Sequence, residues 1–121
     1  METCLVVDDS AVIRKVAHRI LEGLGFRIAE AEDGVKGLEI CKRGMPDVVL
    51  LDWSMPVMDG YEFVRLLRQM PGGDQPKVVV CTTENDIAQI ARAMHAGADE
   101  HFMKPFDKEI LTAKFQEAGL A

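Results

Sequence analysis

Apolar residues along the chain form two alternating patterns, short continuous runs and stripes that recur every three to four residues. Continuous runs are typical of strands buried on both faces, and stripes are typical of amphipathic helices. The expected strands are 4–7, 26–31, 47–51, 77–81 and 100–103. The expected helices are 10–23, with Ser10 as its N-cap, 33–41, one around 63–67, one around 87–94, and one after Pro105. The pattern therefore predicts five consecutive βα units.

Helices between successive strands indicate parallel strands that are joined by right-handed crossovers. Five such units predict an α/β, flavodoxin-like doubly wound domain, with a five-stranded parallel sheet in the order 2-1-3-4-5 and five helices. The 121 residues fit the usual size of one domain, and no repeat, low-complexity stretch or linker interrupts them. We therefore expect a single domain over residues 1–121, with no output domain.

Composition narrows the class of protein. A hydrophobic content of 48% with 28% charged residues is typical of a chain that folds around a core. The formal net charge of -6 argues against binding to nucleic acid, which requires clustered Lys and Arg. No apolar run approaches the ~18 residues of a membrane span. The three cysteines lack the CxxC spacing of a metal or redox site. We expect a cytoplasmic monomer that binds neither nucleic acid nor membrane.

Polar residues stand just past the ends of four predicted strands. They are Asp8 and Asp9 after the first strand, Asp52 after the third, Thr82 and Thr83 after the fourth, and Lys104 after the fifth. In an open α/β sheet, the crevice at the carboxyl ends of the strands is the expected ligand site. Three carboxylates brought together there repel each other unless a divalent cation or a lysine compensates. We therefore expect Mg²⁺ at the three aspartates, with Lys104 as a fixed positive charge.

The chain resembles a response-regulator receiver domain, and most closely the stand-alone chemotaxis-type regulators called CheY-like. The matching segments are 5–10, 31–34, 52–60, 96–98 and 104–106. Asp-Asp or Lys-Pro-Phe alone is a weak signal. The segments together, in order and at strand ends, are specific, and they span nearly the whole chain.

The resemblance implies a role for each acid of the site. Asp52 corresponds to the phosphoacceptor, and Asp8 and Asp9 correspond to the acidic pair around Mg²⁺. Ser54 matches the residue whose backbone carbonyl binds the metal. The implied chemistry is attack of the Asp52 carboxylate on the phosphohistidine of a sensor histidine kinase or a histidine phosphotransfer protein. Slow self-dephosphorylation follows, so we expect no dedicated enzyme.

The resemblance also implies a switch. Thr82 corresponds to the hydroxyl that is drawn toward the phosphoryl group, and the ring of His101 turns into the space that it leaves. The family usually carries Tyr or Phe at the position of His101. Lys104 matches the family's invariant lysine, whose bond to the following proline is usually cis. Ser54 and Glu84 match positions that tune the access of water.

The implied output is protein binding. In the bacterial two-component regulators that this chain resembles, the face made by helix four, strand five and helix five changes on phosphorylation. It then binds a downstream target protein in trans, of the chemotaxis-motor or phosphorelay type.

Several of these residues also have structural interpretations. Asp8, Asp9 and Ser10 could form a helix-capping cluster, and the threonines after the fourth strand could be turn residues. The pair Arg14-Lys15 is interpreted as a solvated helix face, and Trp53 as a partly exposed aromatic beside the pocket.

Two other functional classes fit the sequence less well. A phosphohydrolase on a similar scaffold needs an acid two residues after its nucleophile, and here that residue is Ser54, which cannot protonate a leaving group. A nucleotide- or flavin-binding module needs a glycine-rich phosphate loop, and neither GxGxxG nor a P-loop occurs. The receiver is therefore the favoured class.

Overall fold

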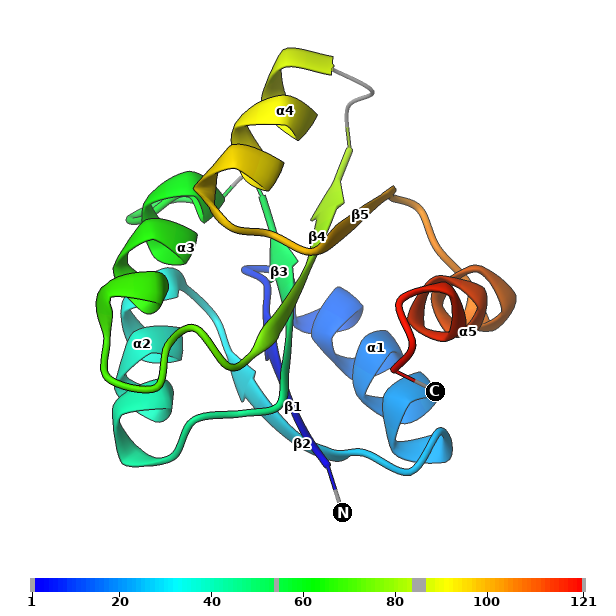
Figure 1. The fold of residues 1–121 in the computed structure, drawn as a ribbon. Coiled ribbons are helices and arrows are strands. Elements are labelled where there is room, and N and C mark those ends of the chain that lie inside the picture. The colour runs from blue at the N-terminus through cyan, green and yellow to red at the C-terminus, as the bar shows by residue number, and fades with distance from the viewer. Residues whose placement is uncertain (1, 54, 84–86, 121) are drawn as a thin grey trace.

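The computed structural model describes residues 2–53, 55–83 and 87–120, in which strands and helices alternate along the chain (Figure 1). The strands are β1 (Thr3–Val7), β2 (Arg27–Ala31), β3 (Val48–Asp52), β4 (Lys77–Thr82) and β5 (Glu100–Met103). The helices are α1 (Ala11–Gly23), α2 (Gly34–Arg43), α3 (Gly60–Gln69), α4 (Ile87–Ala96) and α5 (Lys108–Glu117). The five predicted βα units are confirmed.

The strands form one parallel sheet in the order β2-β1-β3-β4-β5, which confirms the predicted topology. Helices α1 and α5 cover one face, and α2, α3 and α4 lie on the other (Figure 1). Strand β1 sends Leu5 and Val7 into the core under α2 and α3, and Cys4 and Val6 into the core under α1 and α5. Burial on both faces is the reason that its apolar run is continuous.

Short polar side chains begin four of the helices. Ser10, Asp33, Asp59 and Asp107 each accept a hydrogen bond from the backbone N–H three residues later. These caps explain why α2 and α5 begin at Gly34 and Lys108. Gly25, with a φ of +99°, follows the end of α1 and turns the chain into β2.

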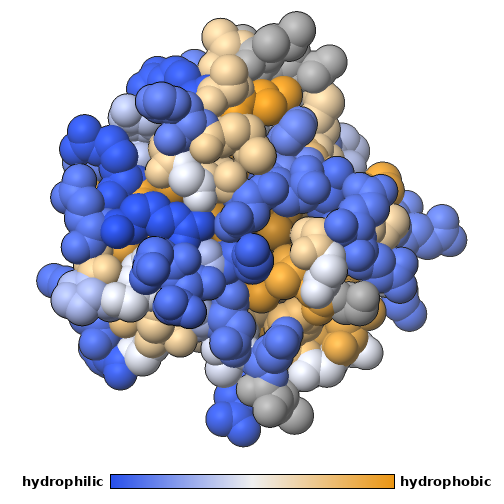
Figure 2. Space-filling model, viewed as in Figure 1, coloured by the Kyte–Doolittle hydropathy of each residue, from blue (hydrophilic) through white to orange (hydrophobic). Residues whose placement is uncertain are grey.

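The surface in the orientation of Figure 1 is mostly hydrophilic, with hydrophobic residues visible between the hydrophilic ones near its centre (Figure 2). Among the described residues, no helix is both long enough and apolar enough to cross a bilayer.

Candidate functional site

The carboxyl edge of the sheet collects the polar residues that follow or end its strands. Asp8 comes directly after β1, and Asp52 is the last residue of β3, where it pairs with Cys81 in the ladder. The two strands are neighbours, with Val7 opposite Leu51. Thr82 ends β4, and Lys104 follows β5. The sequence predicted Asp52 just past its strand, and the ladder extends one residue further.

Three carboxylates meet at this edge. One ligand oxygen from each of Asp8, Asp9 and Asp52 lies within 4.8 Å of the others. Asp8 and Asp52 are only 3% and 5% exposed, whereas Asp9 is exposed. Like charges at this spacing repel each other, and hard oxygen donors are the ligands that Mg²⁺ prefers. The donor set therefore fits the predicted Mg²⁺ site.

Lys104 supplies a positive charge to the same pocket. Its Nζ donates to Asp8 Oδ2 at 2.8 Å and lies 3.5 Å from Asp52 Oδ1. Burial alone lowers the pKa of Lys104, but the hydrogen bond to Asp8 and the charges of Asp52 and Asp8 outweigh that effect and raise it. The ammonium is therefore charged throughout the neutral pH range.

In the loop after β1, one residue caps a helix and another belongs to the acid pocket. Ser10 Oγ accepts from the Ile13 N–H at 3.3 Å and caps α1. Asp8 instead turns toward Lys104, and its Oδ1 accepts from the Ser10 N–H at 2.9 Å. The capping interpretation therefore holds for Ser10 and not for Asp8.

The predicted switch residues lie on β4 and β5. The Thr82 side chain is 5% exposed, and the Thr82 carbonyl accepts from the Lys104 N–H at 2.6 Å. His101 is partly buried and lies opposite Val80 in the ladder. The peptide bond between Lys104 and Pro105 is cis, as the resemblance implies. Ser54 and Glu84 lie outside the residues that the structure describes.

The interpretation of Trp53 as partly exposed was wrong. Its side chain is 6% exposed, and its indole Nε1 donates to Gln89 Oε1 on α4 at 3.0 Å. Gly60 permits this packing, because a Cβ there would lie 2.4 Å from Trp53 Cε3. The ring thus fills the space between the loop after Asp52 and α4.

The interpretation of Arg14 as part of a solvated helix face was also wrong. Its side chain is 16% exposed, and its guanidinium donates to the Asp8 carbonyl and pairs with Glu30 on β2. Arg14 lies four residues after Ser10, which puts it one helical turn beyond the loop that carries the acids. This spacing is the signal that could have indicated its contact.

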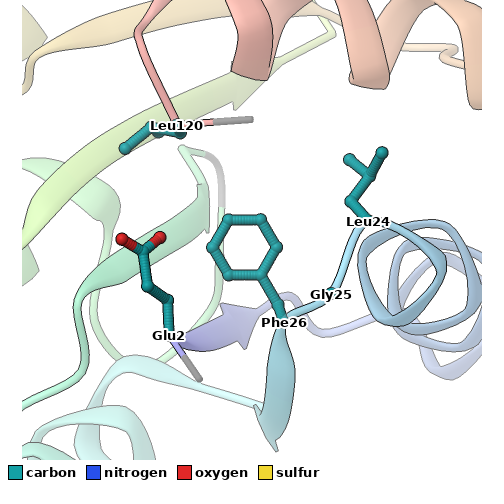
Figure 3. Close-up of a pocket in the computed structure, with 5 residues that line it drawn as sticks. All are labelled: Glu2, Leu24, Gly25, Phe26 and Leu120. Carbon is teal, nitrogen blue, oxygen red and sulfur yellow. The ribbon is translucent and has the colours of Figure 1, made fainter.

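A separate hollow lies at the opposite, amino edge of the sheet. It is lined by Glu2, Leu24, Gly25, Phe26 and Leu120, and the Phe26 ring lies between Glu2 and Leu24 (Figure 3). A single carboxylate beside apolar side chains offers neither a metal-binding set nor a nucleophile. We assign no function to this hollow.

The family model of the response regulator receiver domain matches residues 4–116. The chain belongs to this family. It is therefore a response regulator receiver domain of two-component signalling.

Two relatives that the chain matches are longer than the chain itself. Response regulator MprA of Mycobacterium sp. (strain KMS) is 37% identical over 112 residues, which are 93% of this chain and 48% of that protein. The probable transcriptional regulator ycf27 of Guillardia theta is 36% identical over 115 residues, which are 95% and 44% of the two chains. The chain spans about half the length of the relatives that it matches.

Solved structures of receiver domains have the same fold. Chemotaxis protein CheY4 of Vibrio cholerae is 31% identical, with a TM-score of 0.92 over 98% of each chain. The receiver domain of the sensor histidine kinase PA1611 of Pseudomonas aeruginosa PAO1 is 26% identical, with a TM-score of 0.84 over 98% of each chain. That structure has a magnesium ion coordinated in its active site cleft. The CheY-like fold expected from the sequence is confirmed.

Proposed function

We propose that Asp52 of this receiver domain accepts a phosphoryl group from the phosphohistidine of a sensor histidine kinase or a histidine phosphotransfer protein. The observation that carries the proposal is the convergence of three carboxylates and one ammonium at the carboxyl edge of the sheet. The acid oxygens lie within 4.8 Å of one another, and Lys104 Nζ lies 2.8 Å from Asp8 and 3.5 Å from Asp52.

The transfer exchanges one bond to phosphorus for another. An Asp52 oxygen forms a bond to phosphorus as the bond from phosphorus to the histidine nitrogen breaks, and the imidazole leaves with that electron pair. The Lys104 ammonium offsets negative charge on the phosphoryl oxygens, and the Thr82 hydroxyl can donate to them. Mg²⁺ held by Asp8, Asp9 and Asp52, with the Ser54 carbonyl as a further predicted ligand, would offset the charge of the acids and the phosphoryl group.

A partner protein recognises the phosphorylated state because phosphorylation changes the surface of the domain. Thr82 moves toward the phosphoryl group, His101 turns into the vacated space, and the face of α4, β5 and α5 then binds a downstream target protein. The bond from the Lys104 N–H to the Thr82 carbonyl supports this coupling, because it joins the two strands at the pocket. Ser54 and Glu84 are proposed to set the slow rate of self-dephosphorylation, and the domain is proposed to act as a cytoplasmic monomer.

Trp53 offers a direct test, because it follows Asp52 in the chain and is buried. We expect the fluorescence of this single tryptophan to change on titration with Mg²⁺, and to change again when beryllofluoride, a phosphoryl mimic, is added. The matched control is Asp52→Asn, which keeps the side-chain shape but removes the nucleophilic oxygen. An absent response of the wild-type protein at millimolar Mg²⁺, or an undiminished beryllofluoride response in Asp52→Asn, would contradict the proposal.

A further inference from the structure

The guanidinium of Arg14, near the start of α1, lies behind the acid pocket. Its Nη1 donates to the Asp8 backbone carbonyl at 2.6 Å, and its Nε donates to Glu30 Oε1 at 3.3 Å. The proposed phosphoryl transfer gives neither Arg14 nor Glu30 a task. A charged side chain that is 84% removed from solvent and aimed at a backbone carbonyl nevertheless fixes that carbonyl.

The carbonyl of Asp8 determines how the chain enters Asp9. It belongs to the same planar peptide unit as the Asp9 N–H, so a contact that fixes the carbonyl also fixes the orientation of this peptide. The remaining polar groups of Asp8 are held independently. Its N–H donates to the Ala31 carbonyl at 3.1 Å, its Oδ1 accepts from the Ser10 N–H, and its Oδ2 accepts from Lys104.

Asp9 is held less firmly than Asp8. It is exposed, and its carboxylate receives no hydrogen bond from any residue in the described part of the chain. Its place within 4.8 Å of the other two acids therefore depends on its backbone. The peptide that Arg14 holds is the first link of that backbone.

Glu30 holds Arg14 in this position. Glu30 lies on β2 opposite Val6 of β1, and its second oxygen lies 2.7 Å from Nδ1 of His18. His18 is one turn further along α1 than Arg14, so a single carboxylate contacts two successive turns of the helix. The rotamer of Arg14 is restricted as a result.

We propose that Arg14, anchored by Glu30, is a positioning residue that orients the peptide between Asp8 and Asp9 and keeps the Asp9 carboxylate in the metal-binding set. The inference rests on the proposed function of the site. Electrostatics alone predicts that removing the positive charge of Arg14 from beside a cation site tightens cation binding. The positioning role predicts the opposite result, that the loss of Arg14 weakens Mg²⁺ binding.

The test compares Mg²⁺ affinities by Trp53 fluorescence in Arg14→Met, Arg14→Lys and the matched control Lys15→Met. Lys15 is exposed on the same helix, and its replacement removes the same charge. We expect Arg14→Met to weaken Mg²⁺ binding about tenfold, as loss of a residue that orients a ligand commonly does. Arg14→Lys should also weaken it, because lysine keeps the charge but lacks the planar fork. Lys15→Met should leave it unchanged or slightly tighter.

A second measurement needs no metal. In the metal-free protein, the Asp9 amide should exchange faster and shift in the NMR spectrum of Arg14→Met, with a smaller change of the same kind in Glu30→Gln. Urea unfolding identifies any variant that fails to fold, and Glu30→Gln then replaces Arg14→Met in both measurements. The inference would be overturned if a folded variant bound Mg²⁺ at least as tightly as the wild type and its Asp9 amide were unaltered. Wild-type protein that does not bind Mg²⁺ would contradict the proposed function instead, and the amide measurement would still decide whether Arg14 orients the peptide.

Discussion

The two ends of the sheet differ in how their charged side chains are paired. At the amino end, the Arg68 guanidinium makes five hydrogen bonds, two to Gly97 O, one each to Gly73 O and Pro76 O, and one to Asp99 Oδ2 at 3.1 Å. The same Asp99 oxygen accepts from the Val78 N–H at 2.8 Å. At the carboxyl end, three carboxylates share one pocket with the Lys104 ammonium.

This difference separates a structural role from a functional one. A charge whose hydrogen-bonding groups are satisfied by carbonyls and one counter-charge stabilises the segments that it joins. A pocket with more negative than positive charge lowers the free energy of unfolding, but it leaves oxygens available to a cation or a phosphoryl group. Substitution of Arg68 should therefore lower stability and leave ligand binding intact, whereas substitution of an acid at the carboxyl end should weaken ligand binding and raise the stability of the metal-free protein.

The largest effect on stability is expected from Arg68→Met. The variant leaves the carbonyls of Gly73, Pro76 and Gly97 without their donor, and we expect the free energy of unfolding to fall by about 3 kcal/mol. Urea unfolding measures the loss. The Mg²⁺ affinity, from Trp53 fluorescence, should be unchanged. Reduced Mg²⁺ affinity in a folded Arg68→Met protein would break the separation between the two ends.

Asp52→Asn should raise the stability of the metal-free protein, whereas Arg68→Met lowers it. Removing one of three neighbouring carboxylates relieves repulsion with Asp8 and Asp9, and we expect the metal-free protein to gain about 1 kcal/mol of stability. Added Mg²⁺ should stabilise the wild-type protein more than the variant, because it binds the folded site with all three acids. Urea midpoints in EDTA and in Mg²⁺ measure both effects. A less stable Asp52→Asn in EDTA would show that the acids do not destabilise the site.

High pH should reduce stability at both ends alike. Burial raises the pKa of the Cys4 thiol and of the Cys81 thiol from 9.0 to about 12. The folded state therefore keeps protons that the unfolded state loses, so this contribution is intact below pH 9.0 and declines as the pH rises toward 12. We expect a loss of about 1 kcal/mol per thiol at about pH 10, with smaller losses in Cys4→Ala and Cys81→Ala. A flat profile above pH 9.0 would contradict the burial of both thiols.

The smallest expected effect concerns strain in the loop that follows Asp52. Val57 is 78% exposed and has a φ of +73°, a left-handed conformation that a β-branched side chain rarely adopts. Val57→Asn should raise the free energy of unfolding by about 0.5 kcal/mol, because asparagine tolerates this conformation. Val12→Asn, at a 71% exposed valine on α1, is the matched control and should give no such gain. Equal effects of the two changes would argue against strain at Val57.

The sequence predicted the fold well because burial on both faces leaves a local signal. The central strands β1, β3 and β4 each have an apolar run, whereas the edge strands β2 and β5 are only partly buried. Asp8 and Asp52 were found because they end or follow such runs, and Lys104 because it follows the last strand. The inward contacts of Arg14 and Arg68 were not predicted. A long charged side chain on a helix looks solvated from the local pattern, and the groups that its tip reaches come from other elements.

The burial of Trp53 was missed for a similar reason. It depends on the indole bond to Gln89, 36 residues away in the chain, and on the absence of a side chain at Gly60. Neither condition can be read from the residues next to Trp53. Contacts between distant segments therefore remain the part of the site that this one sequence does not disclose.

The central claim is that Asp52 receives the phosphoryl group. The most direct measurement is to incubate the protein with Mg²⁺ and a phosphorylated histidine kinase or acetyl phosphate, and to map the modified residue by mass spectrometry. We predict a single phosphoryl group on Asp52 that hydroxylamine removes, as expected of an acyl phosphate, and none on Asp52→Asn. A phosphoryl group on another residue, or equal modification of Asp52→Asn, would contradict the account.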